Sequence, residues 1–116
     1  MMTIDKLTAL ARQWIDAMNG HDIEAVLALY ADDADHTSPA TDFISGKGSL
    51  REWWSGCFDR LPSLRYVVLS ITAQEPNRVI LEYQRLADSQ PAWAVAEVFE
   101  VDTSGLITHS RVYHGC

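Results

Sequence analysis

The sequence has 116 residues, of which 47% are hydrophobic, and a formal net charge of −7. A chain of this length can bury a core without disulfide or metal cross-links. Nucleic-acid and anionic-membrane binding depend on clustered lysine and arginine, so the acidic balance argues against both partners. We therefore expect one globular domain over residues 1–116 that binds neither nucleic acid nor membrane.

Cysteine usage and the N-terminal sequence indicate the compartment. Cys57 and Cys116 lack the spacing of a zinc site or a disulfide framework, and both are predicted to be free thiols in a reducing compartment. The N-terminus carries charge where a signal peptide needs an apolar run, and no window approaches about 18 apolar residues. These features predict a cytoplasmic protein.

Two helices are expected at the start of the chain. Apolar residues recur at three- and four-residue steps over 3–18, with Thr3 as the N-cap, and Asn19-Gly20 supplies a left-handed stop. Asp22 can cap a second helix, whose apolar positions continue to Tyr30. Together the two helices should form a hairpin.

Three aspartates follow at the expected exit of the second helix. Asp32, Asp33 and Asp35 resemble a metal cluster, but the glycine-bearing loop of a calcium site is missing. We expect them to be solvated and to bind no metal.

A third helix is expected after two short extended pieces, around His36 and Phe43-Ile44. Residues 49–52, SLRE, match a capping box, and Pro62 ends the helix. Its predicted buried stripe consists of Leu50, Trp53, Trp54, Cys57, Phe58 and Leu61.

From Leu64 onward the hydrophobic period changes from helical to two. The pattern predicts four strands, over residues 64–74, 78–87, 92–101 and 106–114. Pro76-Asn77 and Thr103-Ser104-Gly105 are typical of hairpin turns. Helices followed by an antiparallel meander indicate an α+β domain with the helices on one face of a curved sheet.

The third predicted strand carries an acid on its apolar face. The alternating set consists of Trp93, Val95, Glu97, Phe99 and Val101. Burial would raise the pKa of Glu97, as a general acid or a hydrogen-bond-donating carboxylic acid requires. Two alternatives stay open: this face is exposed to solvent near Glu97, or Glu97 forms a structural pair with a cross-strand partner.

The last hairpin brings more polar residues to the same face. A turn with two loop residues would place Glu97 opposite Ser110, Val95 opposite Val112 and Trp93 opposite His114. Glu97, Ser110 and His114 then share a face, although a longer loop with a bulge would alter the register. His109 and His114 point to opposite faces, which excludes a metal shared between them.

Motifs for phosphate binding, for a nucleophile elbow and for a Cys/His pair are all missing from the sequence. The chemistry that remains is acid/base catalysis by histidine, glutamate and tyrosine in an apolar pocket. We therefore expect no cofactor.

Three segments carry a resemblance to a known family: WIDAMNGHDIEAVLALYADDADHTSP, GKGSLREWW and AEVFEVDTSGLITHSRVYHG. They resemble the nuclear transport factor 2-like (NTF2-like) superfamily, specifically its branch of SnoaL-like polyketide cyclases and ketosteroid isomerases. The resemblance implies a cone in which three N-terminal helices pack on a strongly curved, mixed, mostly antiparallel sheet. It also implies an apolar cavity between them and, usually, a homodimer.

The resemblance to ketosteroid isomerases is incomplete at the site. The proton-shuttling aspartate before a proline corresponds to Ser38, ahead of Pro39, and the tyrosine donor of the first helix corresponds to Trp14. The protonated carboxylic acid of the oxyanion hole, held neutral by apolar surroundings, corresponds to Glu97. The usual route of steroid isomerisation is therefore not expected.

The resemblance and the strand alternation together suggest the roles. His36 should point inward with Ser38 and act as the base, since imidazole titrates near neutrality; the alternatives are a satisfied histidine at the pocket rim, or His114 as the base. Glu97 would be the acid or oxyanion donor, with Tyr83 as a supporting donor. The expected substrate-binding residues are Trp14, Tyr30, Ser38, Trp53, Phe58, Trp93, Phe99, Ser110, Val112 and His114.

We therefore expect a cofactor-independent cyclase, isomerase or dehydratase that acts on a hydrophobic carbonyl compound. The alternative is a non-catalytic domain for small-molecule binding or protein interaction on the same fold. Because the sheet is apolar on both faces, a homodimer is expected through its outer face. The residues expected there are Val67, Leu69, Ile71, Ile80 and Tyr113.

Overall fold

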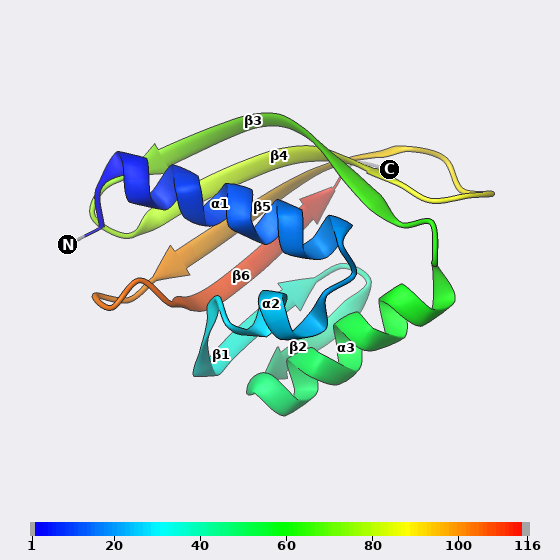
Figure 1. Cartoon of the computed structure of the whole chain (residues 1–116), viewed down its shortest axis with the longest axis horizontal. Coiled ribbons are helices and arrows are strands. Elements are labelled where there is room, and N and C mark those ends of the chain that lie inside the picture. The colour runs from blue at the N-terminus through cyan, green and yellow to red at the C-terminus, as the bar shows by residue number, and fades with distance from the viewer. Residues whose placement is uncertain (1, 115–116) are drawn as a thin grey trace.

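The computed structural model describes residues 2–114, without the side chain of residue 42, as three helices packed on one six-stranded sheet (Figure 1). The helices are α1 (Ile4–Asn19), α2 (Ile23–Leu27) and α3 (Lys47–Arg60). The strands are β1 (Tyr30–Ser38), β2 (Thr41–Ser45), β3 (Arg65–Gln74), β4 (Arg78–Leu86), β5 (Trp93–Val101) and β6 (Ile107–His114).

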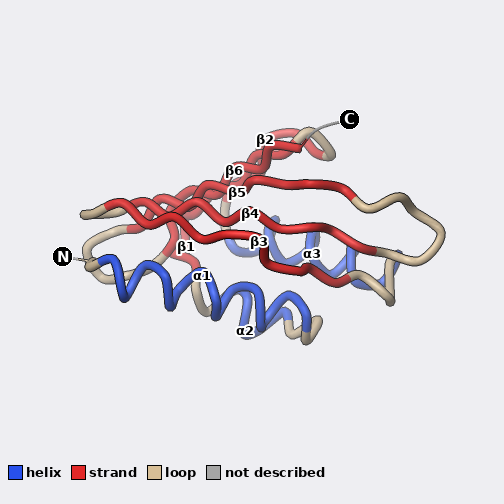
Figure 2. Tube along the Cα trace, turned by 90° about the horizontal axis from the view of Figure 1, so that it is seen from above, coloured by secondary structure: helices blue, strands red, loops and turns tan. Residues whose placement is uncertain are grey.

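The sheet is mixed, with the strand order β2-β1-β6-β5-β4-β3. Strands β3 to β6 form the expected antiparallel meander, and β1 joins it by parallel pairing with β6. All three helices lie on one side of the sheet (Figure 2), although α3 follows the β1–β2 hairpin instead of following α2 directly. The α+β prediction is thus confirmed, and the sheet has a helix-covered inner face and an uncovered outer face.

The helical hairpin turns one residue later than its sequence suggests. Gly20 is right-handed, with φ −80°, and His21 takes the left-handed conformation, with φ 50°. A side chain there is disfavoured unless contacts hold it. The His21 ring is held, because Nε2 lies 2.7 Å from the Leu64 carbonyl oxygen and the ring stacks on Phe58 at 4.5 Å. The helix therefore stops at Asn19-Gly20 as predicted, but the left-handed residue is His21 and not Gly20.

The second helix is shorter than predicted. Asp22 does cap it, since its side chain accepts the Ala25 N–H at 3.1 Å, but the helix ends at Leu27. Tyr30 opens β1, so the aspartates that follow lie on a strand and not at a helix exit. Among the described residues, no group of three or more His, Cys, Asp or Glu side chains could hold a metal ion.

The third helix begins at Lys47, two residues before the predicted capping box. Its N-cap is Gly46, at φ 89°, which makes no side-chain capping bond, so the SLRE interpretation is wrong. Leu50, Trp54 and Phe58 are buried, and the other three residues of the predicted stripe are half-buried. Cys57 is a free thiol, whereas Cys116 lies outside the described residues. No described helix has both the length and the apolar character needed to cross a membrane.

The β5–β6 register differs from the predicted one by two residues. Val95 pairs with His114, Glu97 with Val112 and Phe99 with Ser110. The predicted two-residue turn is wrong because the loop is longer, and Asp102 Oδ1 closes it by accepting the N–H groups of Ser104 and Leu106 at 2.9 and 3.0 Å. A shift of two preserves the face, so Glu97, Ser110 and His114 still lie on the inner face.

A bulge in β3 changes which residues face outward. The register with β4 shifts between Val68 and Ser70, so Leu69 is the extra residue and Ile71 pairs with Leu81 in the core. Placing Ile71 on the outer face is therefore wrong. The other predicted outer-face residues keep their places: Val67, Leu69, Ile80 and Tyr113.

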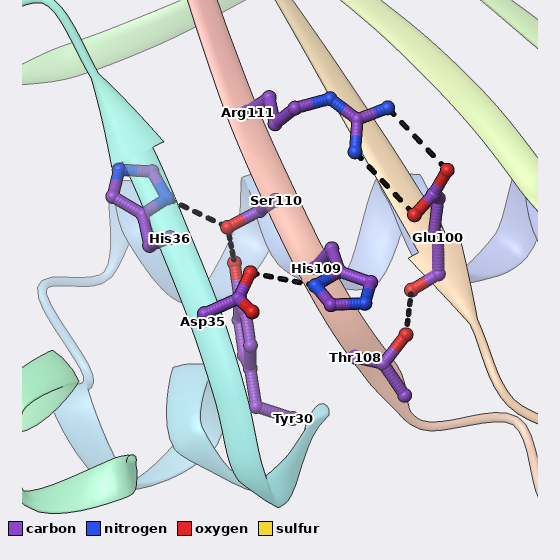
Figure 3. Close-up of polar contacts among 8 residues, drawn as sticks. All are labelled: Tyr30, Asp35, His36, Glu100, Thr108, His109, Ser110 and Arg111. Atoms are coloured by element: carbon purple, nitrogen blue, oxygen red, sulfur yellow. Dashed lines mark hydrogen bonds and ion pairs between the residues drawn. The ribbon is translucent and has the colours of Figure 1, made fainter. Parts of the chain in front are cut away.

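The outer face combines exposed apolar residues with charged neighbours. Val67, Leu69 and Tyr113 are 43%, 58% and 56% exposed. Toward β1 the face carries ion pairs, including Glu100 with Arg111 at 3.4 Å (Figure 3). An apolar patch with a polar rim is typical of a protein interface.

We predict that this outer face mediates a homodimer. Sedimentation at micromolar concentration should give a mass near twice 13.0 kDa. Leu69→Arg should produce a monomer or an aggregate, because an unpaired charge in a desolvated interface is costly, whereas Leu69→Met should remain dimeric. A wild-type mass near 13.0 kDa would contradict the prediction.

Candidate functional site

A cavity of about 480 Å³ lies between the inner face of the sheet and helices α1 and α3. The predicted site residues that line it are Trp14, His36, Ser38, Trp53, Tyr83, Trp93, Glu97, Val112 and His114. Four predicted lining residues do not reach it: Tyr30, Phe58, Phe99 and Ser110. Phe58 stacks on His21, and the other three are fully buried in the core behind the cavity.

Glu97 lies on the inner face of β5 and is 1% exposed. The Tyr83 hydroxyl donates to Glu97 Oε1 at 2.8 Å, and among the described residues Oε2 has no hydrogen-bond partner. Burial raises the pKa of Glu97 to about 8, although the hydrogen bond from Tyr83 acts in the opposite direction. Glu97 is therefore a mostly protonated carboxylic acid at neutral pH. The alternative of solvent exposure is wrong, whereas the alternative of a cross-strand partner is confirmed in Tyr83 of the neighbouring strand β4.

Aromatic rings surround this carboxyl group. Trp14 stacks on Tyr66 with ring centroids 5.7 Å apart and an interplanar angle of 5°, and Tyr66 contacts Tyr83 at 4.5 Å. Burial raises the pKa of both tyrosines, so their hydroxyls stay neutral hydrogen-bond donors. These rings keep water away from Glu97 and maintain the apolar surroundings that shift its pKa.

A second polar group, His36, is connected to Trp14 through the core. Trp14 Nε1 donates to the Tyr30 hydroxyl at 3.2 Å, and this hydroxyl donates to Ser110 Oγ at 3.2 Å. Ser110 Oγ lies 2.6 Å from His36 Nδ1 (Figure 3). This last contact forms because the parallel register of β1 and β6 places His36 beside Ser110. We call this chain of hydrogen bonds the Trp14–His36 relay.

The first bond of the relay has a defined direction because an indole N–H can only donate. Tyr30 accepts from Trp14 and donates to Ser110, which leaves the Ser110 hydrogen available to His36. With the Ser110 hydrogen donated to Nδ1, the hydrogen of the neutral imidazole resides on Nε2; with Nδ1–H donated to Ser110, it resides on Nδ1. In the first of these tautomers His36 presents a donor from a ring that borders the cavity.

The expectation that His36 titrates near neutrality is wrong. It is 2% exposed, and burial lowers its pKa to about 4, while Asp35 raises it by a smaller amount. The ring is therefore neutral at physiological pH, and it is a much weaker base than an exposed histidine.

The sequence analysis missed several residues that line the cavity. They are Ala40, Trp54, Cys57, Arg60, Leu61, Leu64, Tyr66, Arg85, Gln90 and Val95. Strand alternation could have revealed Tyr66 and Arg85, since both lie in phase with Tyr83 on the inner face. The loop residue Gln90 has no comparable periodic signal.

A family model of the SnoaL-like domain matches residues 11–110. The chain belongs to the SnoaL-like family. Its NTF2-like fold also agrees with that of a SnoaL-like protein of unknown function from Burkholderia thailandensis, with a TM-score of 0.90, 22% identity and 100% of both chains covered.

Two further solved structures share the fold of this SnoaL-like chain. An NTF2-like protein of unknown function from Cytophaga hutchinsonii has a TM-score of 0.78 at 19% identity, covering 99% of this chain and 92% of the other. A proposed ketosteroid isomerase from Kribbella flavida has a TM-score of 0.84 at 20% identity, covering 100% and 82%. No curated protein matches the sequence. At these identities the structural likeness shows the fold alone.

Ser38 of this SnoaL-like chain lines the cavity where an aspartate would lie in the ketosteroid isomerase pattern. Its Oγ accepts the Ala40 N–H at 3.0 Å and so helps to close the β1–β2 turn. A serine hydroxyl does not ionise near neutral pH. Proton transfer by this SnoaL-like chain would therefore need another group.

Glu97 should make stability depend on pH. Because its folded-state pKa of about 8 lies above the ordinary 4.5, the folded protein keeps a proton that the unfolded chain releases in this interval. The free energy of unfolding should therefore fall as pH rises from 4.5 to 8, by up to about 5 kcal/mol.

Chemical denaturation of wild type and Glu97→Gln at both ends of this range measures that contribution. The difference in stability between the two proteins should change with pH, whereas Glu52→Gln, at an exposed helix position, should track the wild type. Parallel pH profiles for wild type and Glu97→Gln would contradict the prediction.

Proposed function

We propose that this SnoaL-like protein is a cofactor-independent enzyme that moves a proton on a hydrophobic carbonyl compound, as in cyclisation, isomerisation or dehydration. One observation carries the proposal: the buried Glu97 has an unpartnered Oε2 in a cavity that also contains the neutral His36. An unsatisfied buried polar atom is costly, and a substrate that hydrogen-bonds to it would remove that cost.

In this proposal Glu97 is the group that takes and returns the proton. A pKa of about 8 leaves a fraction ionised at neutral pH, and that carboxylate is a stronger base than an ordinary glutamate. Tyr83 holds Oε1 by its hydrogen bond and supports the negative charge, while Oε2 is left for the substrate. After accepting the proton at Oε2, the same group can return it to another atom of the substrate.

His36 is assigned the donor's role in place of the base's role expected from sequence. Removing a proton next to a carbonyl breaks a C–H bond and moves its electron pair toward oxygen, where negative charge develops. The Nε2–H of a neutral imidazole can stabilise that oxygen, and the proposal takes the tautomer in which Ser110 donates to Nδ1. The SnoaL-like family match, together with a fold shared with a proposed ketosteroid isomerase, is compatible with carbonyl chemistry of this class.

Proton exchange in D₂O tests the proposal without knowledge of the natural substrate. The protein is incubated with a panel of aryl ketones, and loss of the signal from protons next to the carbonyl is followed by NMR. Wild type should catalyse exchange with some members of the panel, and Glu97→Gln should slow it by about 10² to 10⁴-fold, the usual contribution of an acid/base group.

Two controls separate chemistry from folding. His109→Gln, on the outer face where His109 pairs with Asp35, should exchange as fast as wild type. A Glu97→Gln variant that exchanges at the wild-type rate would remove Glu97 from the mechanism. Thermal stabilisation by ligands without exchange of any ketone would favour the non-catalytic binding domain instead.

The pH dependence should distinguish the two roles of a single carboxyl group. If Glu97 acts as the base, the exchange rate should rise with pH and level off above about 8, because the ionised fraction grows through its pKa. Initial rates between pH 5.5 and about 9.5 would trace this profile. A rate that instead falls through pH 8 would assign Glu97 the role of acid.

A further inference from the structure

Charged groups in the cavity have the opposite sign to the protein as a whole. The sequence has 16 acidic residues and 9 lysines and arginines. Among the described residues that line the cavity, however, the permanently charged ones are Arg60 and Arg85, and the one acid is Glu97. Since Glu97 is mostly protonated at neutral pH, the lining favours anions over cations.

Arg85 is held in place by neutral partners. It pairs with Trp93 across β4 and β5, and its guanidinium lies 4.8 Å from the Trp93 ring centroid. Its Nη1 donates to Gln90 Oε1 at 3.0 Å. The Trp93 ring also stacks with His114, with ring centroids 4.8 Å apart. The guanidinium is thus oriented before any ligand arrives, and no carboxylate of the described residues pairs with it.

Arg60, in the last turn of α3, also lies beside an aromatic ring. Its guanidinium lies 5.8 Å from the Trp53 ring centroid. Among the described residues, Arg60 and Arg85 form no ion pair with a carboxylate; the same holds for Arg12 and Arg65 outside the cavity, while Arg51 pairs with Glu24 at 2.7 Å. What distinguishes Arg60 and Arg85 is that both line one cavity, so a ligand held there can supply the acid.

We propose that the cavity binds an apolar oxo acid, whose carboxylate pairs with Arg85 and Arg60 while its carbonyl lies near Glu97. This proposal names the substrate class of the proposed function and rests on that function for the role of the carbonyl. A guanidinium fork matches a carboxylate in two parallel hydrogen bonds. The aromatic rings of Trp14, Tyr66 and Tyr83 supply the surface for the apolar part.

The strand spacing limits where the two functional groups of the ligand can lie. Arg85 is level with Trp93, and Glu97 follows four residues later on β5, about 13 Å along the strand. The two side chains bridge part of that distance, and the ligand must span the remainder. The carboxylate and the carbonyl should therefore be separated by several carbons, as in 4-oxo and 5-oxo acids.

Titration calorimetry with matched acids and amides tests this inference. The probes are 3-benzoylpropanoate, 5-oxo-5-phenylpentanoate and their primary amides, which keep the shape and lose the charge. The carboxylates should bind wild type at least about 10-fold more tightly than their amides. This preference should weaken as KCl rises from about 20 to about 500 mM.

Charge-matched variants locate the binding group. Arg85→Gln should abolish most of the preference for carboxylates, and Arg60→Gln, at an exposed position, should reduce it. Arg12→Gln removes the same charge from the exposed face of α1 and should leave the preference intact. Equal affinities for acids and amides, or equal losses in Arg85→Gln and Arg12→Gln, would overturn the inference.

The two proposals fail separately. Carboxylate preference without exchange of any ketone would refute the proposed function and uphold the binding class. Exchange restricted to uncharged ketones, without any carboxylate preference, would uphold the function and refute the binding class.

Discussion

The structure depends on one constraint: the carboxyl group of Glu97 is enclosed by apolar and aromatic side chains. A carboxylate without water or a cation is costly, so the group keeps its proton to a much higher pH than an exposed glutamate. Tyr83 satisfies one oxygen of the group and leaves the other unsatisfied. The aromatic wall, the neutral tyrosines and the neutral His36 keep the surroundings of Glu97 uncharged, whereas the charges of Arg60 and Arg85 lie at a less buried part of the cavity lining.

Protonation of His36 limits this uncharged state at low pH, and ionisation of Glu97 limits it at high pH. The lowered pKa of His36 means that acid favours the unfolded chain as pH falls from 6.5 to about 4, since the unfolded histidine binds the proton more readily. The raised pKa of Glu97 has the opposite effect as pH rises above 4.5. Between pH 4.5 and 6.5 the two contributions to the free energy of unfolding therefore change in opposite directions. Both groups are uncharged between about pH 4 and about pH 8, that is, in mildly acidic to neutral solution.

The order of elements could be predicted from sequence because hydrophobic periodicity decides it. The four meander strands begin and end within about one residue of the predicted limits, since the alternation of apolar residues is strong there. Local geometry was harder to predict. The bulge at Leu69 moves Ile71 to the inner face, and the left-handed His21 depends on contacts with distant residues. Such contacts leave no local pattern.

The candidate site also combines features that the sequence could predict with features that it could not. Glu97 could be found because an acid within an apolar alternating set is conspicuous in sequence. Its shifted pKa follows from burial alone, which the alternation already implies. The relay that reaches His36 could not be found, because its hydrogen bonds join Trp14, Tyr30 and Ser110 from three separate elements.

The place of β6 in the sheet has a consequence for synthesis of the protein. Although β6 comes last of the described strands, it lies between β1 and β5, and Ser110 meets a tyrosine 80 residues earlier. While β6 is still inside the ribosome, the edges of β1 and β5 that will pair with β6 have no partner, and His36 lacks the Ser110 hydroxyl. The six-stranded sheet can therefore close only after β6 emerges. The ordering of the relay therefore coincides with the completion of the fold.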